Sequence, residues 1–239
     1  MTLARDGWKE MLLISLLAGG ATIALTYYFW PAAPVTALLW LAGLAFFRVP
    51  ARRIPADPDV LIAPADGTIT DITALPHVAE VGGPATRIGI FLSVFDVHVN
   101  RSPCAASVVS VRHQPGLFLD ARDARAGEQN ESTTIVLTPD APMPRPIVVR
   151  QIAGLIARRI VCRLSPGQKL ARGELFGLIK FGSRTELIVP ADPHLVPTVA
   201  IGQHVAGGAT ILMRLTAPAD QRKGSHEAQR QTREPAAST

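Results

Sequence analysis

The N-terminal part of the chain carries a long uncharged run that predicts helix within a membrane. The 37 residues between Glu10 and Arg48 contain no charged side chain. As one straight helix this run would be roughly 55 Å long, whereas the hydrocarbon core of a bilayer is about 30 Å thick. Pro31 and Pro34 divide it into a longer and a shorter stretch. We therefore predict a hairpin or a re-entrant segment, with residues 1–49 as a membrane-anchoring leader.

Basic residues flank the apolar run on both sides: Arg5, Lys9, Arg48, Arg52 and Arg53. Because cytoplasmic loops of membrane proteins are enriched in lysine and arginine, both ends are expected on the cytoplasmic side. A cleaved signal peptide is the alternative. The run is long for a signal peptide, and Asp6 and Glu10 offset the basic residues before it.

Residues 50–216 show the pattern of a mainly β domain. Short apolar and β-branched runs such as VLIAPADGTITDI, STTIVLTPD, LFGLIKFG and TILMRL alternate with glycine, proline and aspartate. The turn sequence GQKLARG at 167–173 recurs as GQHVAGG at 202–208, each time before an apolar strand. We predict a small β-sandwich or barrel-like domain. Only IAGLIARRI has a helical pattern, and its β-branched residues leave helix and strand both open. Residues 217–239 are polar and predicted to be a disordered tail.

Composition and charge narrow the class of protein. With 239 residues, 48% of them hydrophobic, the chain is not disordered throughout. Cys104 and Cys162 are too few for a framework of several disulfides, which favours a reducing compartment. The net charge is +5, and residues 141–172 hold seven basic side chains and no acidic one: Arg145, Arg150, Arg158, Arg159, Arg163, Lys169 and Arg172. With few aromatic residues and no nucleic-acid motif, a lipid headgroup is a better anionic partner than DNA. Ordinary solvated strand faces remain the alternative.

Two of the segments that could carry chemistry centre on a hydroxyl and a carboxyl group. Gly182 and Ser183 stand between two apolar strands, where a tight bend could expose the hydroxyl group and the preceding carbonyl. No GxSxG pattern is present to suggest a hydrolase, and a structural turn is the alternative. Asp66 lies in PADG, where the residues alone favour an Asp-Gly turn over a functional carboxyl group.

The other two candidate segments hold a histidine and a polar loop. His98 in FDVHVNRSP alternates with Val97 and Val99, so it faces the opposite side of a strand. A buried structural histidine explains that position as well as a catalytic one. Asn130 and Glu131 end the polar segment EQNE, which could be a solvated loop.

Taken together, these segments resemble the short bacterial form of phosphatidylserine decarboxylase, a pyruvoyl-dependent enzyme made as a proenzyme. The blocks PADG, FDVHVNRSP, HQPGLF, EQNE, QIAGLIARR and RGELFGLIKFGSR occur in the order and approximate spacing of that family. The resemblance covers about residues 50–215, and its last block is the most specific. It implies a membrane-bound lyase that converts phosphatidylserine into phosphatidylethanolamine and carbon dioxide.

The resemblance also implies that the chain cuts itself between Gly182 and Ser183. The products would be a β chain of residues 1–182 and an α chain of residues 183–239, which remain together as a heterodimer. Ser183 would attack the carbonyl of Gly182, and β-elimination from the resulting ester would convert the serine into a pyruvoyl group. His98 would take the serine proton, with Asp66 orienting the imidazole. The pyruvoyl ketone would form a Schiff base with the substrate amine, so neither a metal nor pyridoxal phosphate is expected.

Arg101 departs from the pattern of longer family members, which carry a second histidine at this position. His98 is therefore expected to serve both self-cleavage and decarboxylation. Arg101 is a candidate for holding the lipid phosphate or carboxylate, and Asn130 and Glu131 complete the expected substrate-binding set. The resemblance places the β domain on the cytoplasmic side of the inner membrane, with no nucleic-acid partner. The resemblance is also compatible with an oligomer larger than the heterodimer of the α and β chains.

Two other classes of function fit parts of the sequence. The repeated G-Q-x-[L/V]-A-x-G turns are also typical of domains that carry biotin or lipoate. Those domains present a modifiable lysine within an MKM or DKA-like triplet, and neither triplet occurs here. A lipid-binding or scaffold protein descended from the enzyme is the other alternative, and it would keep an intact chain.

Overall fold

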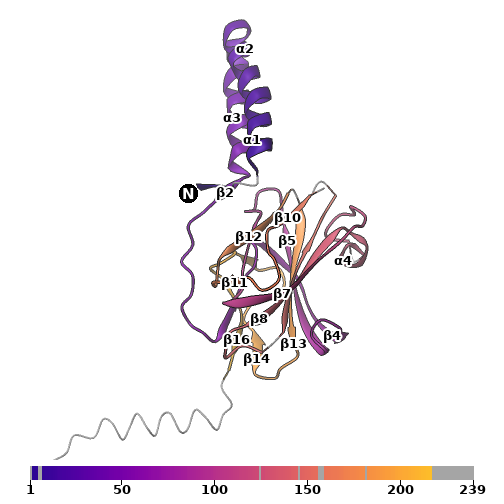
Figure 1. Cartoon of the computed structure of the whole chain (residues 1–239). Helices are drawn as coiled ribbons and strands as arrows, with labels where there is room; N and C mark the ends of the chain where they lie inside the picture. The colour runs from indigo at the N-terminus through magenta and orange to yellow at the C-terminus, as the bar shows by residue number, and fades with distance from the viewer. Residues whose placement is uncertain are drawn as a thin grey trace, which may run out of the picture.

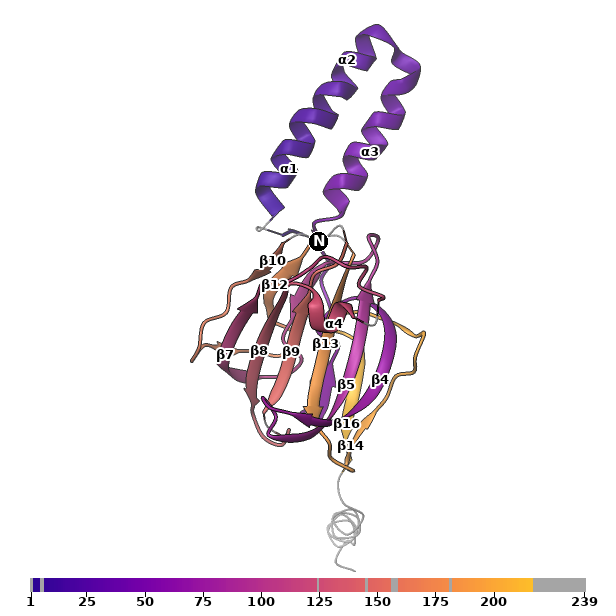
Figure 2. The ribbon, with the colours of Figure 1, turned by 90° about the vertical axis from the view of Figure 1, so that its right-hand side faces the viewer.

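A helical hairpin projects from one end of a β domain (Figures 1 and 2). The computed structural model describes residues 2–4, 7–123, 125–144, 146–155, 159–180 and 182–216. The predicted tail at 217–239 lies outside these described residues.

The hairpin consists of two antiparallel helical arms. Helix α1 (Trp8–Ile14) continues through a π-helical turn (Ser15–Gly19) into α2 (Gly20–Tyr28), so the first arm is one continuous helix. A 3-10 turn (Trp30–Ala32) leads into α3 (Ala33–Ala45), which returns to the β domain (Figure 2). The indole Nε1 of Trp40 donates to Oγ of Ser15 at 3.1 Å and joins the two arms. Among the described helices, only Trp8–Tyr28 is long and apolar enough to cross a membrane.

The prolines explain where the hairpin turns. Pro31 and Pro34 lie in the first turns of the 3-10 helix and of α3. A proline is tolerated there because its missing N–H would have no partner within the helix. The apolar side chains of the arms are largely exposed, including Leu12, Leu13, Leu16, Leu17, Leu38 and Leu39.

The β domain is built on one antiparallel sheet of eight strands that curls into half a barrel (Figure 2). Its order is β11 (Lys169–Leu170), β7 (Ala106–Gln114), β8 (Ser132–Pro139), β9 (Ile147–Ile152), β13 (Ser183–Pro190), β5 (Gly83–Leu92), β4 (Gly67–Val78) and β15 (His204–Val205). The prediction of a mainly β fold is confirmed.

Smaller sheets complete the domain. One has the order β10 (Ile160–Cys162), β12 (Leu175–Ile179) and β6 (Val99–Arg101). Another has the order β14 (Leu195–Pro197), β16 (Ile211–Leu215) and β3 (Val60–Ile62). At the base of the hairpin, β1 (Thr2–Leu3) pairs with β2 (Arg48–Val49). A short helix, α4 (Ala126–Gln129), lies between β7 and β8 in the chain.

Strand alternation places the core on one face of the large sheet. On β13, Leu187 and Val189 are fully buried in the main apolar cluster, and Ser183 and Thr185 share their face. Burying each large aliphatic side chain of such a cluster stabilises the fold by about 1.5–3 kcal/mol.

The repeated glycine turns have the same backbone conformation. Gly167 and Gly173 have φ of +85° and +75°, and Gly202 and Gly208 have +86° and +82°. Glycine adopts this left-handed region without steric cost, so the sequence repeat corresponds to a structural one. The described part of IAGLIARRI forms no helix, and its last residue, Ile160, begins strand β10.

The segment between β2 and β3 runs along the outside of the β domain (Figure 1). Arg172 donates to the carbonyl oxygens of Pro55 and Asp57, and Arg101 donates to that of Pro50 at 3.1 Å. These contacts hold the segment in place, and the segment positions the side chain of Arg52 beside that of Asp66.

Candidate active site

Ser183 is the first residue of β13 and is fully buried. Its Oγ has no hydrogen-bond partner in the described part of the chain. Buried hydroxyl groups are normally paired, so an unpaired one indicates a functional position. The preceding Gly182 has φ of +61°, a conformation that glycine adopts readily. The bend predicted at this pair is therefore present, but it does not expose the Ser183 hydroxyl group, which is buried.

His98 is also fully buried, just before β6. Its Nδ1 lies 2.9 Å from the carbonyl oxygen of Asp96. Because a carbonyl oxygen can only accept, the proton belongs on Nδ1, and Nε2 carries the lone pair. Nε2 is buried without a partner among the described residues. Burial lowers the pKa of His98 to about 4, so the ring is neutral at pH 7 and can accept a proton.

A buried hydrogen bond joins β13, which begins at Ser183, to β6, which begins one residue after His98. The side-chain amide of Asn100 donates to Oγ1 of Thr185 at 3.1 Å. Asn100 lies two positions after His98, and Thr185 lies two positions after Ser183. The bond therefore links the two chain segments that carry the candidate base and the candidate nucleophile. Gln151 on β9 extends the network, donating to Oδ1 of Asn100 at 2.8 Å.

The backbone after β9 lies against the carbonyl group of Gly182. A Cβ atom added to Gly154 would lie 1.9 Å from that carbonyl oxygen. The approach is possible only because Gly154 has no side chain. The segment QIAGLIARR therefore contributes backbone contact to the Gly182–Ser183 bond.

Asp66 immediately precedes β4 and is bound by two donors. Its Oδ2 pairs with the guanidinium of Arg52 at 2.5 Å, and its Oδ1 accepts from the backbone N–H of Gly207 at 2.7 Å. Burial raises the pKa of Asp66, and the charge of Arg52 opposes that shift. Neither carboxylate oxygen hydrogen-bonds to His98 within the described residues. The structure thus places Asp66 with Arg52 and Gly207, and its predicted contact with the imidazole is not formed.

The remaining predicted residues have different surroundings. Arg101 is half-buried and donates to the carbonyl oxygens of Gly173 and Pro50. Asn130 is buried, and its side-chain amide bonds to the backbone of Leu119 and Ala153. Glu131 lies 4.0 Å from His113. Asn130 therefore fixes the loop beside Gly154, and the carboxylate of Glu131 is the more accessible group.

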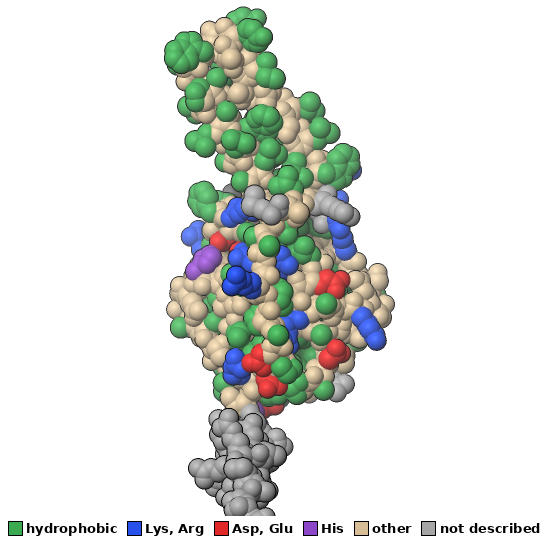
Figure 3. Space-filling model, turned by 90° about the vertical axis from the view of Figure 1, so that its left-hand side faces the viewer, with side chains coloured by type: hydrophobic (Ala, Val, Ile, Leu, Met, Phe, Trp, Pro, Cys, Tyr) green, Lys and Arg blue, Asp and Glu red, His purple; other side chains and the backbone are tan. Residues whose placement is uncertain are grey.

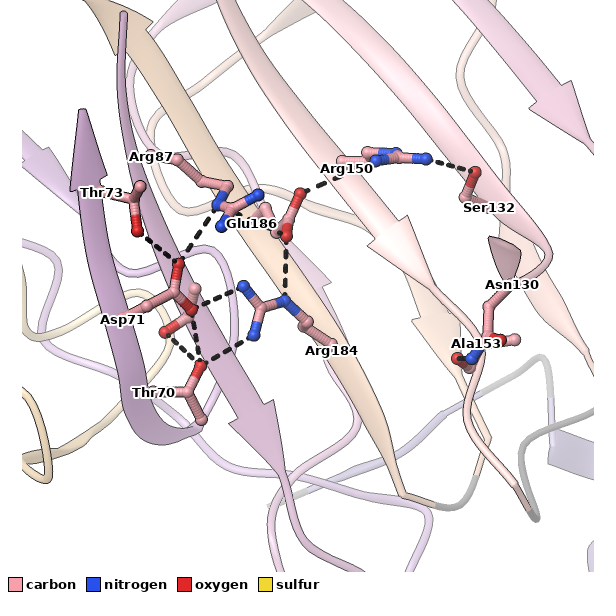
Figure 4. A network of polar contacts seen from close by, with 11 residues as sticks. Thr70, Asp71, Thr73, Arg87, Asn130, Ser132, Arg150, Ala153, Arg184 and Glu186 are labelled. Atoms are coloured by element: carbon pink, nitrogen blue, oxygen red, sulfur yellow. Dashed lines mark hydrogen bonds and ion pairs between the residues drawn. The ribbon is translucent and has the colours of Figure 1, made fainter. Parts of the chain in front are cut away.

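The opposite face of β13 carries a network of ion pairs (Figure 4). Arg184 contacts Asp71 on β4 at 2.6 Å and Glu186 on its own strand at 2.9 Å. Arg87 on β5 lies 3.1 Å from Asp71. Charged groups on three adjacent strands thus fix the position of β13 immediately after Ser183.

Sequence reasoning missed several residues of this site: Phe46, Asn100, Gln151, Gly154 and Thr185. The ring of Phe46 lies against His98. Asn100 lies within the FDVHVNRSP motif, but no role was predicted for it. Gln151 lies at an inward-facing position of an otherwise apolar strand. A polar residue on a buried strand needs a partner, and this was the signal that could have identified Gln151. Among the described residues, no group of three or more His, Cys, Asp or Glu side chains could hold a metal ion.

Comparison with known proteins identifies the family. The family described as phosphatidylserine decarboxylase matches residues 42–213. A phosphatidylserine decarboxylase proenzyme of Pelobacter propionicus is 45% identical over 209 residues, which cover 87% of this chain and 92% of the relative. The proenzyme of Rhodopirellula baltica is 38% identical, over 88% of this chain and 87% of the relative. That of Symbiobacterium thermophilum is 41% identical, over 89% of this chain and 95% of the relative. The chain therefore belongs to the phosphatidylserine decarboxylase family.

Proposed function

We propose that this chain decarboxylates phosphatidylserine with a pyruvoyl group made from its own Ser183. One observation carries the proposal. The hydrogen bond between Asn100 and Thr185 joins β6, which begins just after His98, to β13, which begins at Ser183, and both the Oγ of Ser183 and the Nε2 of His98 are buried without a partner among the described residues. The names of the similar proenzymes support the same activity.

Self-cleavage follows from the groups around Gly182. Nε2 of His98 accepts the proton of the Ser183 hydroxyl, and Oγ attacks the carbonyl carbon of Gly182. The peptide bond is exchanged for an ester. Loss of the Cα proton of residue 183 then expels the Gly182 carboxylate and leaves dehydroalanine, whose imine tautomer takes up water and releases ammonia. The products are chains 1–182 and 183–239.

The residues present fit a pyruvoyl group at position 183. Position 183 is buried, and among the described residues the Oγ that the conversion removes has no partner that would have to be replaced. Such a group supplies a ketone conjugated with an amide carbonyl, which withdraws electrons from an attached amine as carbon dioxide leaves. Nε2 of His98 then holds the proton that the product carbon receives. Oε1 of Gln151, also buried without a partner in the described chain, is available to accept from the substrate amine.

Membrane attachment belongs to the same proposal. The first arm is apolar and exposed, and both arms end at the β domain. Inserted as a hairpin, they would hold the β domain on the cytoplasmic side, where substrate enters laterally from the bilayer. Arg101 and Glu131 are the side chains assigned to the lipid headgroup.

An intact-mass spectrum of the purified full chain tests the proposal. The expected result is two fragments, residues 1–182 and 183–239, the second lacking the mass of one ammonia molecule relative to a serine N-terminus. A single chain with Ser183 intact would overturn the proposal. If both fragments form but phosphatidylserine in detergent micelles releases no carbon dioxide, the assigned substrate is wrong.

A further inference from the structure

A cavity of about 250 Å³ lies where α1 meets strand β10 and the end of β12. Its lining includes Trp8, Lys9, Glu10, Arg159, Arg163 and Lys180. None of these side chains belongs to the proposed reacting groups.

Cationic side chains outnumber acidic ones among the described residues that line this cavity. Four of these lining side chains are cationic and one is a carboxylate. That carboxylate, Glu10, is already paired with Nζ of Lys180 at 2.5 Å, and Lys180 is only 6% exposed. Lys9 and Arg159 are exposed at the rim. Several cations around a small cavity suit a phosphate group, whose oxygens accept from ammonium and guanidinium donors.

The cavity lies at the base of the apolar hairpin. Figure 3 shows apolar side chains over the hairpin, with lysine and arginine side chains on the β domain beside its base. The helix Trp8–Tyr28 has 21 residues, which corresponds to about 30 Å, the thickness of the hydrocarbon core. With the hairpin inserted as proposed above, its first residues would lie at the depth of the lipid headgroups.

The surroundings of Trp8 support this placement of the start of the helix at the lipid headgroups. It is 57% exposed, and the Lys9 ammonium lies 5.6 Å from the centre of its ring. Tryptophan and lysine together are typical of the membrane interface. Leu12 and Leu13 are exposed one turn further into the hairpin, where acyl chains can lie against them.

We propose that this cavity binds the phosphodiester group of an anionic membrane phospholipid. The proposal rests on the membrane placement given above, and it requires neither self-cleavage nor decarboxylation. A lipid is favoured over free phosphate because the exposed leucines beside the cavity offer a surface for acyl chains. The bound lipid would fix the β domain against the bilayer at the side of Lys180.

Native mass spectrometry of the full chain in detergent tests this binding. The probes are phosphatidylglycerol and phosphatidylcholine with identical acyl chains. The double variant Lys9→Gln/Arg159→Gln removes two exposed cations and leaves the pair of Lys180 with Glu10 in place. Arg112→Gln, an exposed position on β7 paired with Glu80, is the matched control.

The wild type and Arg112→Gln should retain phosphatidylglycerol in preference to phosphatidylcholine. The double variant should bind phosphatidylglycerol at least about tenfold more weakly, because each cation near an anionic headgroup contributes to its attraction. Equal binding of the two lipids by the wild type, or unchanged binding by the double variant, would overturn the proposal. So would binding of inorganic phosphate without phosphatidylglycerol.

The same spectra report whether the chain is cut at Ser183. An uncut chain that retains phosphatidylglycerol would refute the proposed self-cleavage and support the lipid site. A cut chain without preference for phosphatidylglycerol would support self-cleavage and refute the lipid site.

Discussion

The aromatic ring of Phe46 lies against the imidazole of His98, with ring centroids 4.2 Å apart and ring planes inclined by 38°. Phe46 follows α3 directly and belongs to an apolar cluster with Phe47, Val97 and Val99. The base of the hairpin thus excludes water from a proposed reacting residue. Because burial is the main cause of the low pKa of His98, the hairpin helps to keep that histidine neutral.

Replacing Phe46 should change the pH dependence of self-cleavage. The His98 pKa of about 4 leaves the ring neutral down to roughly pH 5. In Phe46→Ala, water would stabilise the imidazolium, and the pKa would rise towards 6.5. Self-cleavage of the variant, followed after cell-free synthesis, should therefore slow markedly at pH 5.5 and much less at pH 8. Phe46→Leu keeps the site apolar and should follow the wild type. Superimposable profiles for all three chains would show that Phe46 does not control His98.

Removing the imidazole should stop maturation. His98→Ala leaves the Ser183 hydroxyl without a base, so the variant should accumulate as the uncut 25.5 kDa chain. Ser183→Ala, which lacks the nucleophile, should give the same mass pattern. Circular dichroism typical of β structure would show that both variants are folded. Complete cleavage of His98→Ala would exclude this histidine from self-cleavage.

Local patterns predicted the β domain, because strands and turns are encoded by neighbouring residues, whereas the roles of the site residues came from the resemblance of their motifs to a family. The alternation on β13 separates Thr185 and Leu187 from Arg184 and Glu186, and the glycine turns repeat as their sequences do. The contact of Phe46 with His98 was not predictable in this way. In an apolar leader, a residue that packs on protein and one that faces lipid have the same sequence pattern. The pairing of Arg52 with Asp66 also depends on the path of a segment that has no regular structure.

Gly154 should be indispensable for self-cleavage. A methyl group at this position would lie 1.9 Å from the Gly182 carbonyl oxygen, far inside van der Waals contact, so the scissile bond would be displaced. We expect Gly154→Ala to remain largely uncut in an intact-mass spectrum. Gly83→Ala is the matched control, because a Cβ there meets no atom within 4 Å. Normal cleavage of Gly154→Ala would show that the backbone can move away without consequence.

Arg184 should stabilise the fold through its ion pairs. Its side chain is 11% exposed and that of Glu186 is 1% exposed, so Arg184→Gln should lower the free energy of unfolding by about 2–3 kcal/mol. Burial would raise the pKa of Asp71, but the Arg184 guanidinium holds it below its usual value. The contribution of Asp71 is therefore present above about pH 4 and lost as the pH falls through its folded pKa.

Chemical denaturation at neutral and acidic pH measures this contribution. The difference between wild type and Arg184→Gln should shrink at acidic pH, as Asp71 takes up a proton. Arg125→Gln breaks an exposed pair with Asp123 and should change stability by less than about 1 kcal/mol. Equal stabilities for the two variants would refute a special role for Arg184.

Arg52 should control the charge of Asp66. Burial raises the pKa of Asp66, and the Arg52 guanidinium 2.5 Å away opposes the rise. In Arg52→Gln the carboxyl group should keep its proton to higher pH. If the negative charge of Asp66 supports the imidazolium formed during self-cleavage, the acidic limb of the cleavage profile should move to higher pH. Arg53→Gln, at the exposed neighbouring position, should leave the profile unchanged. On the same condition, Asp66→Asn should cleave slowly at every pH, because it lacks that negative charge. Matching profiles for Arg52→Gln and Arg53→Gln, together with normal cleavage by Asp66→Asn, would remove Asp66 from the mechanism and leave His98 to act without a carboxylate partner.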